Sequence, residues 1–349
     1  MSVVEVIDAN TPLRHAGAKD VTHREAHLMW KIKLHLPVLL FWLSAGLAQA
    51  AQTDPIPDWL QKHVGTGEGQ IAQVVLERAR ALYKDKVREG VVSNACYLAK
   101  DVTRPSAALN GAPNDRFYVI CEAMKSFRAV YSGYGNGRDL AAADFSNGRQ
   151  CARNFSNAEG SKLTMGGAYV TAEHRTSFKG YFTEGGEKKP FLRTFLLFDG
   201  EGETENARER EIGGHVAMFL KWQCRYKDED SPHSDDEGYV PYGRLVNYTG
   251  GRSNGCTTWS IPESESILSL TEGNPTTLYI YPESRDINAV ADAVAKGQSM
   301  SDAGVYWNAR CLKNIGAPKF WPKADLQPVI NAWRDSLPEY PPLVLPICD

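Results

Sequence analysis

The stretch of this chain best suited to chemistry is a glycine-rich turn that ends in a cysteine. It contains the run Gly-Arg-Ser-Asn-Gly-Cys over residues 251–256. Glycine accepts the positive φ of a tight turn, and Gly255 places no side chain beside Cys256. An exposed thiolate is a nucleophile, and the backbone amides of Gly255 and Cys256 can donate to an oxyanion, so the turn offers both parts of an acyl-transfer site. The alternative is a structural cysteine, buried or half of a disulfide.

A nucleophilic cysteine needs a base, and histidine is the most frequent one in proteins. Beyond residue 50 the chain has four candidates: His63, His174, His215 and His233. We expect His215 to be the base, because it follows two glycines and opens an apolar run in which a buried strand can hold its ring. The alternative is a core histidine with a structural hydrogen bond. We expect His174 in a polar turn between strands and His233 in an acidic loop.

The amino-terminal region carries the features of an export signal. Residues 29–35 are basic, residues 36–47 are apolar, and Ala48-Gln49-Ala50 follows. This order predicts a secretory signal peptide cleaved after Ala50, preceded by a polar extension over residues 1–28. A membrane anchor is the alternative, but the apolar run is shorter than the ~20 residues that a spanning helix needs. We therefore predict a secreted or periplasmic protein without stable membrane insertion.

The cysteine count supports the same compartment. All seven cysteines follow residue 50: Cys96, Cys121, Cys151, Cys224, Cys256, Cys311 and Cys348. In an oxidising compartment six can pair and one remains, and Cys256 is the best candidate for the free thiol. No spacing matches a zinc site, so we predict no metal ligands. A net charge of −3 gives no sign of a nucleic-acid partner.

The pattern along the chain predicts a mainly β protein with flanking helices, in the α+β class. Residues 51–90 form a linker and a leading amphipathic helix at 70–88. Residues 91–285 contain the strands, and residues 286–349 form a helical tail with helices at 286–295 and 326–337. The expected strands are 117–120, 127–131, 168–171, 191–198, 215–220 and 277–281. Frequent turns favour a sandwich or barrel-like sheet. The acidic segment 227–238 is predicted to be a solvated loop, with a calcium site as the alternative.

The motif at 251–256 resembles the S-x-G-C active-site signature of L,D-transpeptidases with a YkuD-type catalytic domain. It is most similar to the branch with G-R-S-W-G-C at this place. Three further segments resemble that branch in the same order, namely 131–137, 155–163 and 206–215. Together the motifs cover residues 91–285. The chain departs from many members at Asn254, where they have histidine, and at Thr258, where they have arginine.

The resemblance implies an L,D-transpeptidase-like β-sandwich or barrel domain and assigns roles to individual residues. Cys256 is expected to be the nucleophile and His215 the base, and the amide of Gly255 to help form the oxyanion hole. The substrate-binding residues are expected to be Arg252, Ser253 and Asn254. No metal or organic cofactor is implied.

The resemblance also implies an exported enzyme of the bacterial cell wall, a cysteine acyltransferase acting on peptidoglycan stem peptides. The expected reaction forms a Cys256 thioester, releases the terminal D-Ala and passes the acyl group to an amine. One alternative is a carboxypeptidase or endopeptidase that resolves the same thioester with water. Another is a non-catalytic wall-binding module in which Cys256 is structural.

Overall fold

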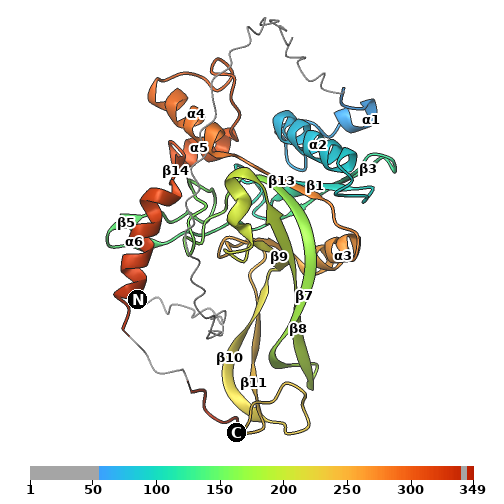
Figure 1. Ribbon diagram of the computed structural model, residues 1–349, viewed down its shortest axis with the longest axis vertical. Coiled ribbons are helices and arrows are strands. Elements are labelled where there is room, and N and C mark those ends of the chain that lie inside the picture. Colours follow the sequence, from blue (N-terminus) through green and yellow to red (C-terminus); the bar gives the residue numbers. More distant parts are fainter. Residues whose placement is uncertain (1–54, 339–343) are drawn as a thin grey trace, which may run out of the picture. The chain divides into compact units, whose positions relative to one another are not determined.

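The computed structural model describes residues 55–338 and 344–349, so the predicted signal peptide and the extension before it lie outside the described residues. Residues 52–349 form one compact unit. Its centre is a ten-stranded mixed sheet with helices packed around it (Figure 1). The described part is therefore mainly β with flanking helices, as its strand-rich sequence predicts.

The helices are α1 (Asp58–Gln61), α2 (Gln73–Arg88), α3 (Ile261–Thr271), α4 (Ser284–Ala295), α5 (Ala309–Ile315) and α6 (Lys323–Asp335), with a 3-10 helix η1 (Gly202–Ala207). The strands are β1 (Tyr97–Asp101), β2 (Asp115–Cys121), β3 (Ser126–Tyr131), β4 (Asp139–Leu140), β5 (Ala143–Asp144), β6 (Asn154–Phe155), β7 (Gly167–Glu184), β8 (Glu187–Gly200), β9 (Gly213–Val216), β10 (Met218–Lys227), β11 (Tyr239–Asn247), β12 (Thr257–Trp259), β13 (Thr277–Tyr281) and β14 (Lys319–Phe320).

The main sheet has the strand order β12-β9-β8-β7-β13-β1-β2-β3, and β11 joins the β10–β11 hairpin to β7. Along this order β12 runs parallel to β9 and β13 runs parallel to β1, while the other neighbours are antiparallel. The two ends of the order are joined, because the N–H of Gly133, just after β3, donates to the carbonyl oxygen of Thr258 in β12 at 3.0 Å. The sheet therefore curves back on itself and encloses one of its faces.

Alternation along β1 divides the apolar residues between the two faces of the sheet. Leu98 belongs to the inner core with Trp259, whereas Tyr97 and Ala99 belong to the core beneath α2. Lys100 follows Ala99 and so falls on the inner side with Leu98. Helix α2 covers the outer face of β1 and β13 with its apolar stripe (Figure 1).

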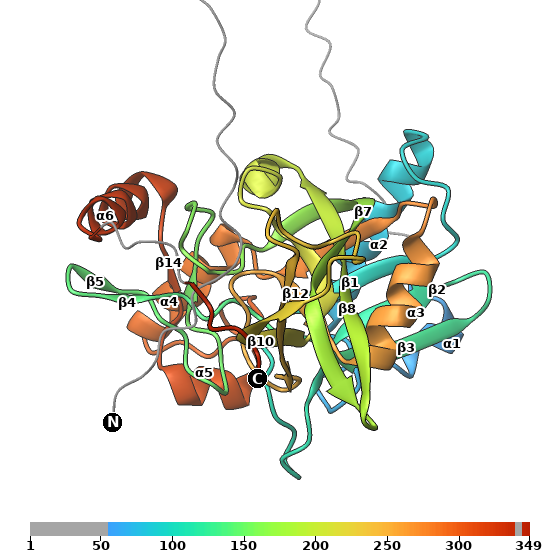
Figure 2. The same ribbon diagram turned by 90° about the horizontal axis from the view of Figure 1, so that it is seen from below.

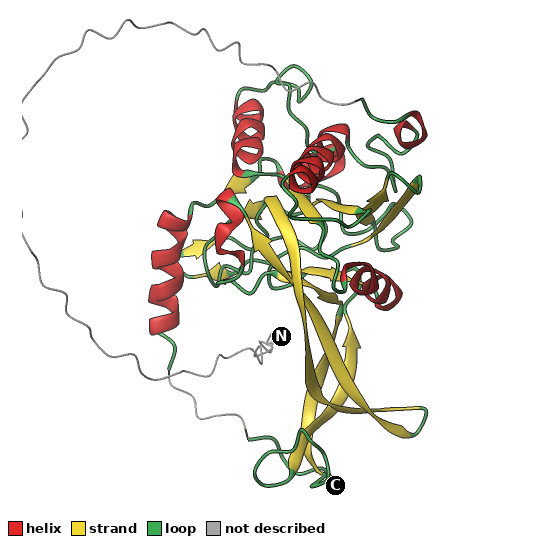
Figure 3. Ribbon diagram, turned by 45° about the vertical axis from the view of Figure 1, so that its right-hand side comes forward, coloured by secondary structure: helices red, strands yellow, loops and turns green. Residues whose placement is uncertain are grey.

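The three predicted helices at 70–88, 286–295 and 326–337 correspond to α2, α4 and α6. Helices α3 and α5 are not predicted by the sequence pattern. Strands β7 and β8 are much longer than expected, and together with β10 and β11 they form two hairpins that extend away from α4 and α5 (Figure 3). The expectation that His174 lies in a turn is wrong, because it lies within β7.

The carboxyl-terminal helices pack on the side of the sheet away from α1 and α3 (Figure 2). Helix α6 contributes Leu326 and Ile330 to a separate small core with Phe145 and Leu163, next to the β4–β5 ribbon. Residues 339–343, which follow α6, are outside the described part. The helices of the carboxyl-terminal segment therefore pack against the β-rich region.

Three disulfides connect distant parts of the chain: Cys96–Cys121, Cys151–Cys311 and Cys224–Cys348. Cys256 is the one cysteine outside these three disulfides, as the odd cysteine count predicts. Three disulfides fit an exported protein, since such bonds persist in oxidising compartments. Within residues 55–338 and 344–349, the helices are all too short or too polar to cross a membrane.

Candidate functional site

The pairing of β12 with β9 brings the predicted nucleophile and base onto neighbouring strands. Strand β12 begins directly after Cys256, and its register with β9 pairs Thr257 with Gly214 and Thr258 with His215. Paired residues share a face of the sheet, and every second residue returns to that face. Continued by one residue, this register places Cys256 diagonally opposite His215.

Two glycines let this part of the fold close tightly. A Cβ on Gly214 would lie 2.1 Å from Cη2 of Trp259, so only glycine allows the buried indole to pack against β9. Gly255 has φ +112°, and a Cβ there would lie 3.2 Å from the carbonyl oxygen of Leu163. These contacts give a physical reason for the glycine immediately before His215 and the one before Cys256.

The Cys256 thiol is partly exposed, and its Sγ lies 3.7 Å from the carbonyl oxygen of Glu211. Two cations are close enough for a Cys256 thiolate to raise their pKa values. Burial lowers the pKa of Arg210, and the thiolate opposes that shift. Burial, followed by the charge of Arg116, lowers the pKa of Lys100 to about 7, and the thiolate again opposes the shift. By reciprocity these cations favour the thiolate, as in reactive cysteine sites.

His215 is buried, and its ring stacks on Phe195 with the centroids 5.4 Å apart. Its Nδ1 lies 2.7 Å from the carbonyl oxygen of Val216. Because a carbonyl only accepts, Nδ1 carries the proton and Nε2 keeps the lone pair. Burial, then the charge of Arg193, lowers the pKa of His215 to about 3. The ring is therefore neutral at pH 7 with its lone pair available, but the same burial lowers its affinity for a proton, so a negative charge on the nearby thiol is needed to favour its protonated form.

The thiol and the imidazole are not hydrogen-bonded to each other in this structure. The His215 ring is hydrogen-bonded to the carbonyl oxygen of Val216, and the Cys256 thiol contacts the carbonyl oxygen of Glu211. Direct proton transfer therefore requires the two side chains to form a hydrogen bond that this structure does not contain. Such contacts often tighten only when substrate binds.

The other three histidines beyond residue 50 belong to other parts of the fold. His174 Nε2 lies 3.0 Å from Thr271 Oγ1. His233, in the predicted loop between β10 and β11, stacks on Phe178, and His63 stacks on Phe127. Only His215 lies on a strand that pairs with β12.

The residues between Gly251 and Cys256 hold the turn together. Ser253 is buried; its N–H donates to the carbonyl oxygen of Tyr134 at 2.7 Å, and its hydroxyl donates to the carbonyl oxygen of Cys256. The N–H of Gly255 donates to Ser253 Oγ at 3.3 Å, so this expected oxyanion donor is turned towards the serine here. Arg252 donates to the carbonyl oxygen of Asn147. Asn254 is the exposed member of the turn.

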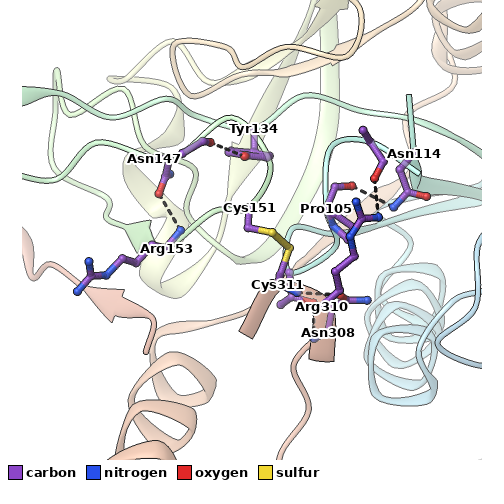
Figure 4. The surroundings of a disulfide bond; sticks show 12 residues. Pro105, Asn114, Tyr134, Asn147, Cys151, Arg153, Asn308, Arg310 and Cys311 are labelled. Carbon is purple, nitrogen blue, oxygen red and sulfur yellow. Dashed lines mark hydrogen bonds between the residues drawn. A yellow bond between two sulfur atoms is a disulfide. The ribbon is translucent and has the colours of Figure 1, made fainter. Parts of the chain in front are cut away.

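The loop that receives Arg252 is fixed by a disulfide. The side chain of Asn147 donates to Gly135 at 2.8 Å and accepts from the N–H of Arg153 at 2.8 Å. Between these residues, Cys151 is bonded to Cys311 at the start of α5 (Figure 4). The disulfide therefore anchors the loop on which the Cys256 turn rests.

Two buried cations under this turn are not predicted by the sequence. Lys100 is fully buried, and its Nζ donates to Thr257 Oγ1 at 3.0 Å. Arg116 is also fully buried; its guanidinium lies over the ring of Tyr134 at 4.9 Å, and none of its nitrogens has a hydrogen-bond partner among the described residues. The only sequence signal for these buried cations was the lysine within the run Tyr-Leu-Ala-Lys-Asp at 97–101.

No group of three or more potential metal ligands gathers anywhere in the part of the chain that the structure describes, the acidic loop at 227–238 included. What the arrangement offers is a partly exposed thiol, nearby cations and a neutral imidazole on the adjacent strand. That combination suits nucleophilic acyl transfer. Comparisons with protein-family models, with curated proteins and with solved structures found no match for this chain.

Proposed function

We propose that this chain is an exported cysteine acyltransferase of the L,D-transpeptidase type, with a YkuD-like catalytic domain over residues 91–285. The observation that carries the proposal is the position of the one cysteine that is not in a disulfide. Six of the seven cysteines are in disulfides, and the seventh, Cys256, directly precedes the strand that pairs with the strand of His215. The four motif resemblances, in the family's order, support the same family and the same substrate class.

In the proposed reaction the Cys256 thiolate attacks the carbonyl carbon of the L-centre in a peptidoglycan stem tetrapeptide. The new C–S bond forms, the amide C–N bond to the terminal D-Ala breaks, and a thioester remains on the enzyme. The D-Ala nitrogen leaves as an amine after it takes up a proton. An amine acceptor then attacks the thioester and restores the thiol, so that covalent catalysis divides one difficult step into two.

The surroundings of Cys256 support a division of labour among the neighbouring groups. His215 is neutral, with a lone pair at Nε2, so it can accept the thiol proton and return it to the leaving amine. Arg210 lies in the turn before β9 and favours the thiolate through its charge. The closed, mainly β sheet is compatible with the barrel-like domain that the motif resemblance implies.

The test is incubation of the purified protein with disaccharide-tetrapeptides, followed by mass spectrometry of the products. Loss of D-Ala together with a new cross-link is the expected result. Loss of D-Ala with uptake of water would replace transpeptidation by hydrolysis as the reaction. Unchanged muropeptides, from protein whose Cys256 is still a free thiol, would contradict the proposal and favour a wall-binding role. Cys256→Ser is the matched control and is expected to release no D-Ala.

A further inference from the structure

The buried cation Lys100 has no structural counter-ion. Its ammonium group is fully enclosed on the inner side of the sheet, and no carboxylate lies within ion-pair distance of it among the described residues. Its hydrogen bond runs to the neutral hydroxyl of Thr257. A charge enclosed in this way is costly unless an anion compensates it.

The anion that can compensate Lys100 is the thiolate next to Thr257. The inner position of Lys100 on β1 and the start of β12 at Thr257 bring the ammonium group to the residue that directly follows Cys256, on the inner face of β12. Cys256 is also the one group that shifts the pKa of Lys100 upwards, against burial and the charge of Arg116. The charged forms of the two side chains therefore stabilise each other.

We propose that Lys100 is a positioning residue of the nucleophile: its enclosed ammonium group stabilises the Cys256 thiolate from inside the sheet and fixes the start of β12 through Thr257. Lys100 does not touch the substrate in this proposal. It acts on the reactivity of the thiol, and the inference rests on the proposed role of Cys256 as nucleophile.

Other titratable groups face this pair and contribute to its pH dependence. They are Arg116 from β2, Tyr131 at the end of β3, Tyr134 after it, Arg210 from the turn before β9, and His215 from β9 itself. Arg116 repels Lys100, whereas Arg210 acts in the same direction as Lys100 on the thiolate. A substitution at Lys100 alone therefore leaves the charge of Arg210 in place.

The structure permits a direct measurement of this effect, because the other six cysteines are in disulfides. Under non-reducing conditions, iodoacetamide alkylation followed by intact-mass spectrometry reports on Cys256 alone. The alkylation rate is measured from pH 5 to 10 for the full chain and for Lys100→Met, which keeps the length and apolar stem but removes the charge. Lys100→Arg restores a charge, and Thr257→Val removes only the hydroxyl acceptor.

In Lys100→Met we expect the midpoint of the alkylation profile to rise by about one pH unit, which corresponds to roughly tenfold slower alkylation below the midpoint. Lys100→Arg is expected to recover most of the rate, and Thr257→Val to change it about twofold or less. As a matched control, Lys189→Met removes a lysine that pairs with Glu184 on the exposed β7–β8 hairpin and is expected to leave the profile unchanged. An unshifted profile in folded Lys100→Met, or equal shifts in Lys100→Met and Lys100→Arg, would overturn the proposal.

A reciprocal measurement applies if Lys100→Met does not fold. NMR of lysine labelled with ¹³C at Cε follows the titration of Lys100 in the wild-type chain and in Cys256→Ala. Loss of the thiolate is expected to move that titration to lower pH, and an unchanged titration would contradict the proposal. Neither readout uses peptidoglycan. If muropeptides are not consumed but alkylation depends on Lys100, only the proposed function fails; if they are consumed and alkylation is independent of Lys100, only this inference fails.

Discussion

The buried charge of Lys100 lowers the stability of the folded chain. Burial lowers its pKa from 10.5 to about 7. Below pH 7 the lysine is protonated in both the folded and the unfolded chain, and the folded state carries the full cost of enclosing the charge. Between pH 7 and 10.5 the unfolded chain holds the extra proton, so this cost falls as the pH rises. A buried cation that weakens the fold is typical of a residue kept for function.

Removing this charge is therefore predicted to stabilise the protein in a pH-dependent manner. Lys100→Met should raise the free energy of unfolding by on the order of a few kcal/mol at pH 6, and by much less at pH 10. Urea denaturation at both pH values, without reductant, measures the difference. Lys189→Met, on the exposed hairpin, should change stability by about 0.5 kcal/mol or less at either pH. A gain in Lys100→Met that is the same at pH 6 and pH 10 would show that the lysine is not titrating as its burial implies.

His215 is the second residue whose role can be isolated. His215→Ala removes the neutral imidazole beside β12 and should slow acylation of Cys256 by a carbapenem, a mimic of the proposed substrate, by on the order of 10²-fold. Adduct formation followed by intact-mass spectrometry gives the rate. His174→Ala is the matched control, because that ring contacts Thr271 instead of the site. Normal acylation in His215→Ala together with slow acylation in His174→Ala would mean that the base is wrongly assigned.

At the scale of elements, the contact between β9 and β12 brings the strand of His215 next to the strand that follows Cys256. It depends on Gly214, where a Cβ would meet the ring of Trp259 at 2.1 Å. Gly214→Ala should therefore destabilise the fold by about 1–3 kcal/mol, since the strands or the indole must move, and should slow acylation as well. Thermal unfolding and carbapenem adduct formation measure the two effects. Gly148→Ala is the control, because its Cβ would meet only Cys151 O at 3.7 Å. Equal losses of stability and of acylation rate in Gly214→Ala and Gly148→Ala would contradict the role given to the β9–β12 contact.

The sequence predicts a helix or strand well when one of its faces is apolar and the other is polar. It predicts an element poorly when both faces are buried or when both are exposed. Helix α2 has a clear apolar stripe and was expected at 70–88. All five residues of β1 are buried, so the strand lacks the alternation that would have shown Lys100 pointing inwards. The outer half of β7, around Arg175, is largely exposed and is held by pairing with β8, which leaves no hydrophobic pattern to detect. Helix α3 is short, and its main signal was Pro262 in the first turn.

At the scale of the whole molecule, the site is assembled from segments far apart in the chain. The candidate nucleophile and base could be proposed from the sequence, because Gly255-Cys256 and Gly214-His215 are local patterns. The cations near Cys256 were not predictable from the sequence, because Lys100 and Arg210 come close to Cys256 only when the sheet closes. The cysteine count predicts one free thiol, but the pairs themselves are set by contacts between distant segments.

The disulfides stabilise the arrangement of these distant segments. Cys151–Cys311 closes a loop of 160 residues and anchors the segment that receives Arg252. Cys224–Cys348 fixes the last residues of the chain to β10. Long closed loops restrict the unfolded chain strongly in the entropic account of disulfides. Cys256 is thus held on a cross-linked framework of disulfides to which it does not itself belong.

The central claim is that Cys256 forms a thioester with a stem tetrapeptide. Its most direct test is intact-mass spectrometry of the non-reduced protein shortly after mixing with disaccharide-tetrapeptide, followed by peptide mapping. The account predicts a covalent adduct equal to the muropeptide minus D-Ala, located on the peptide that contains Cys256 and absent from Cys256→Ala. A protein whose Cys256 reacts readily with iodoacetamide, yet forms no adduct and releases no D-Ala, would contradict it.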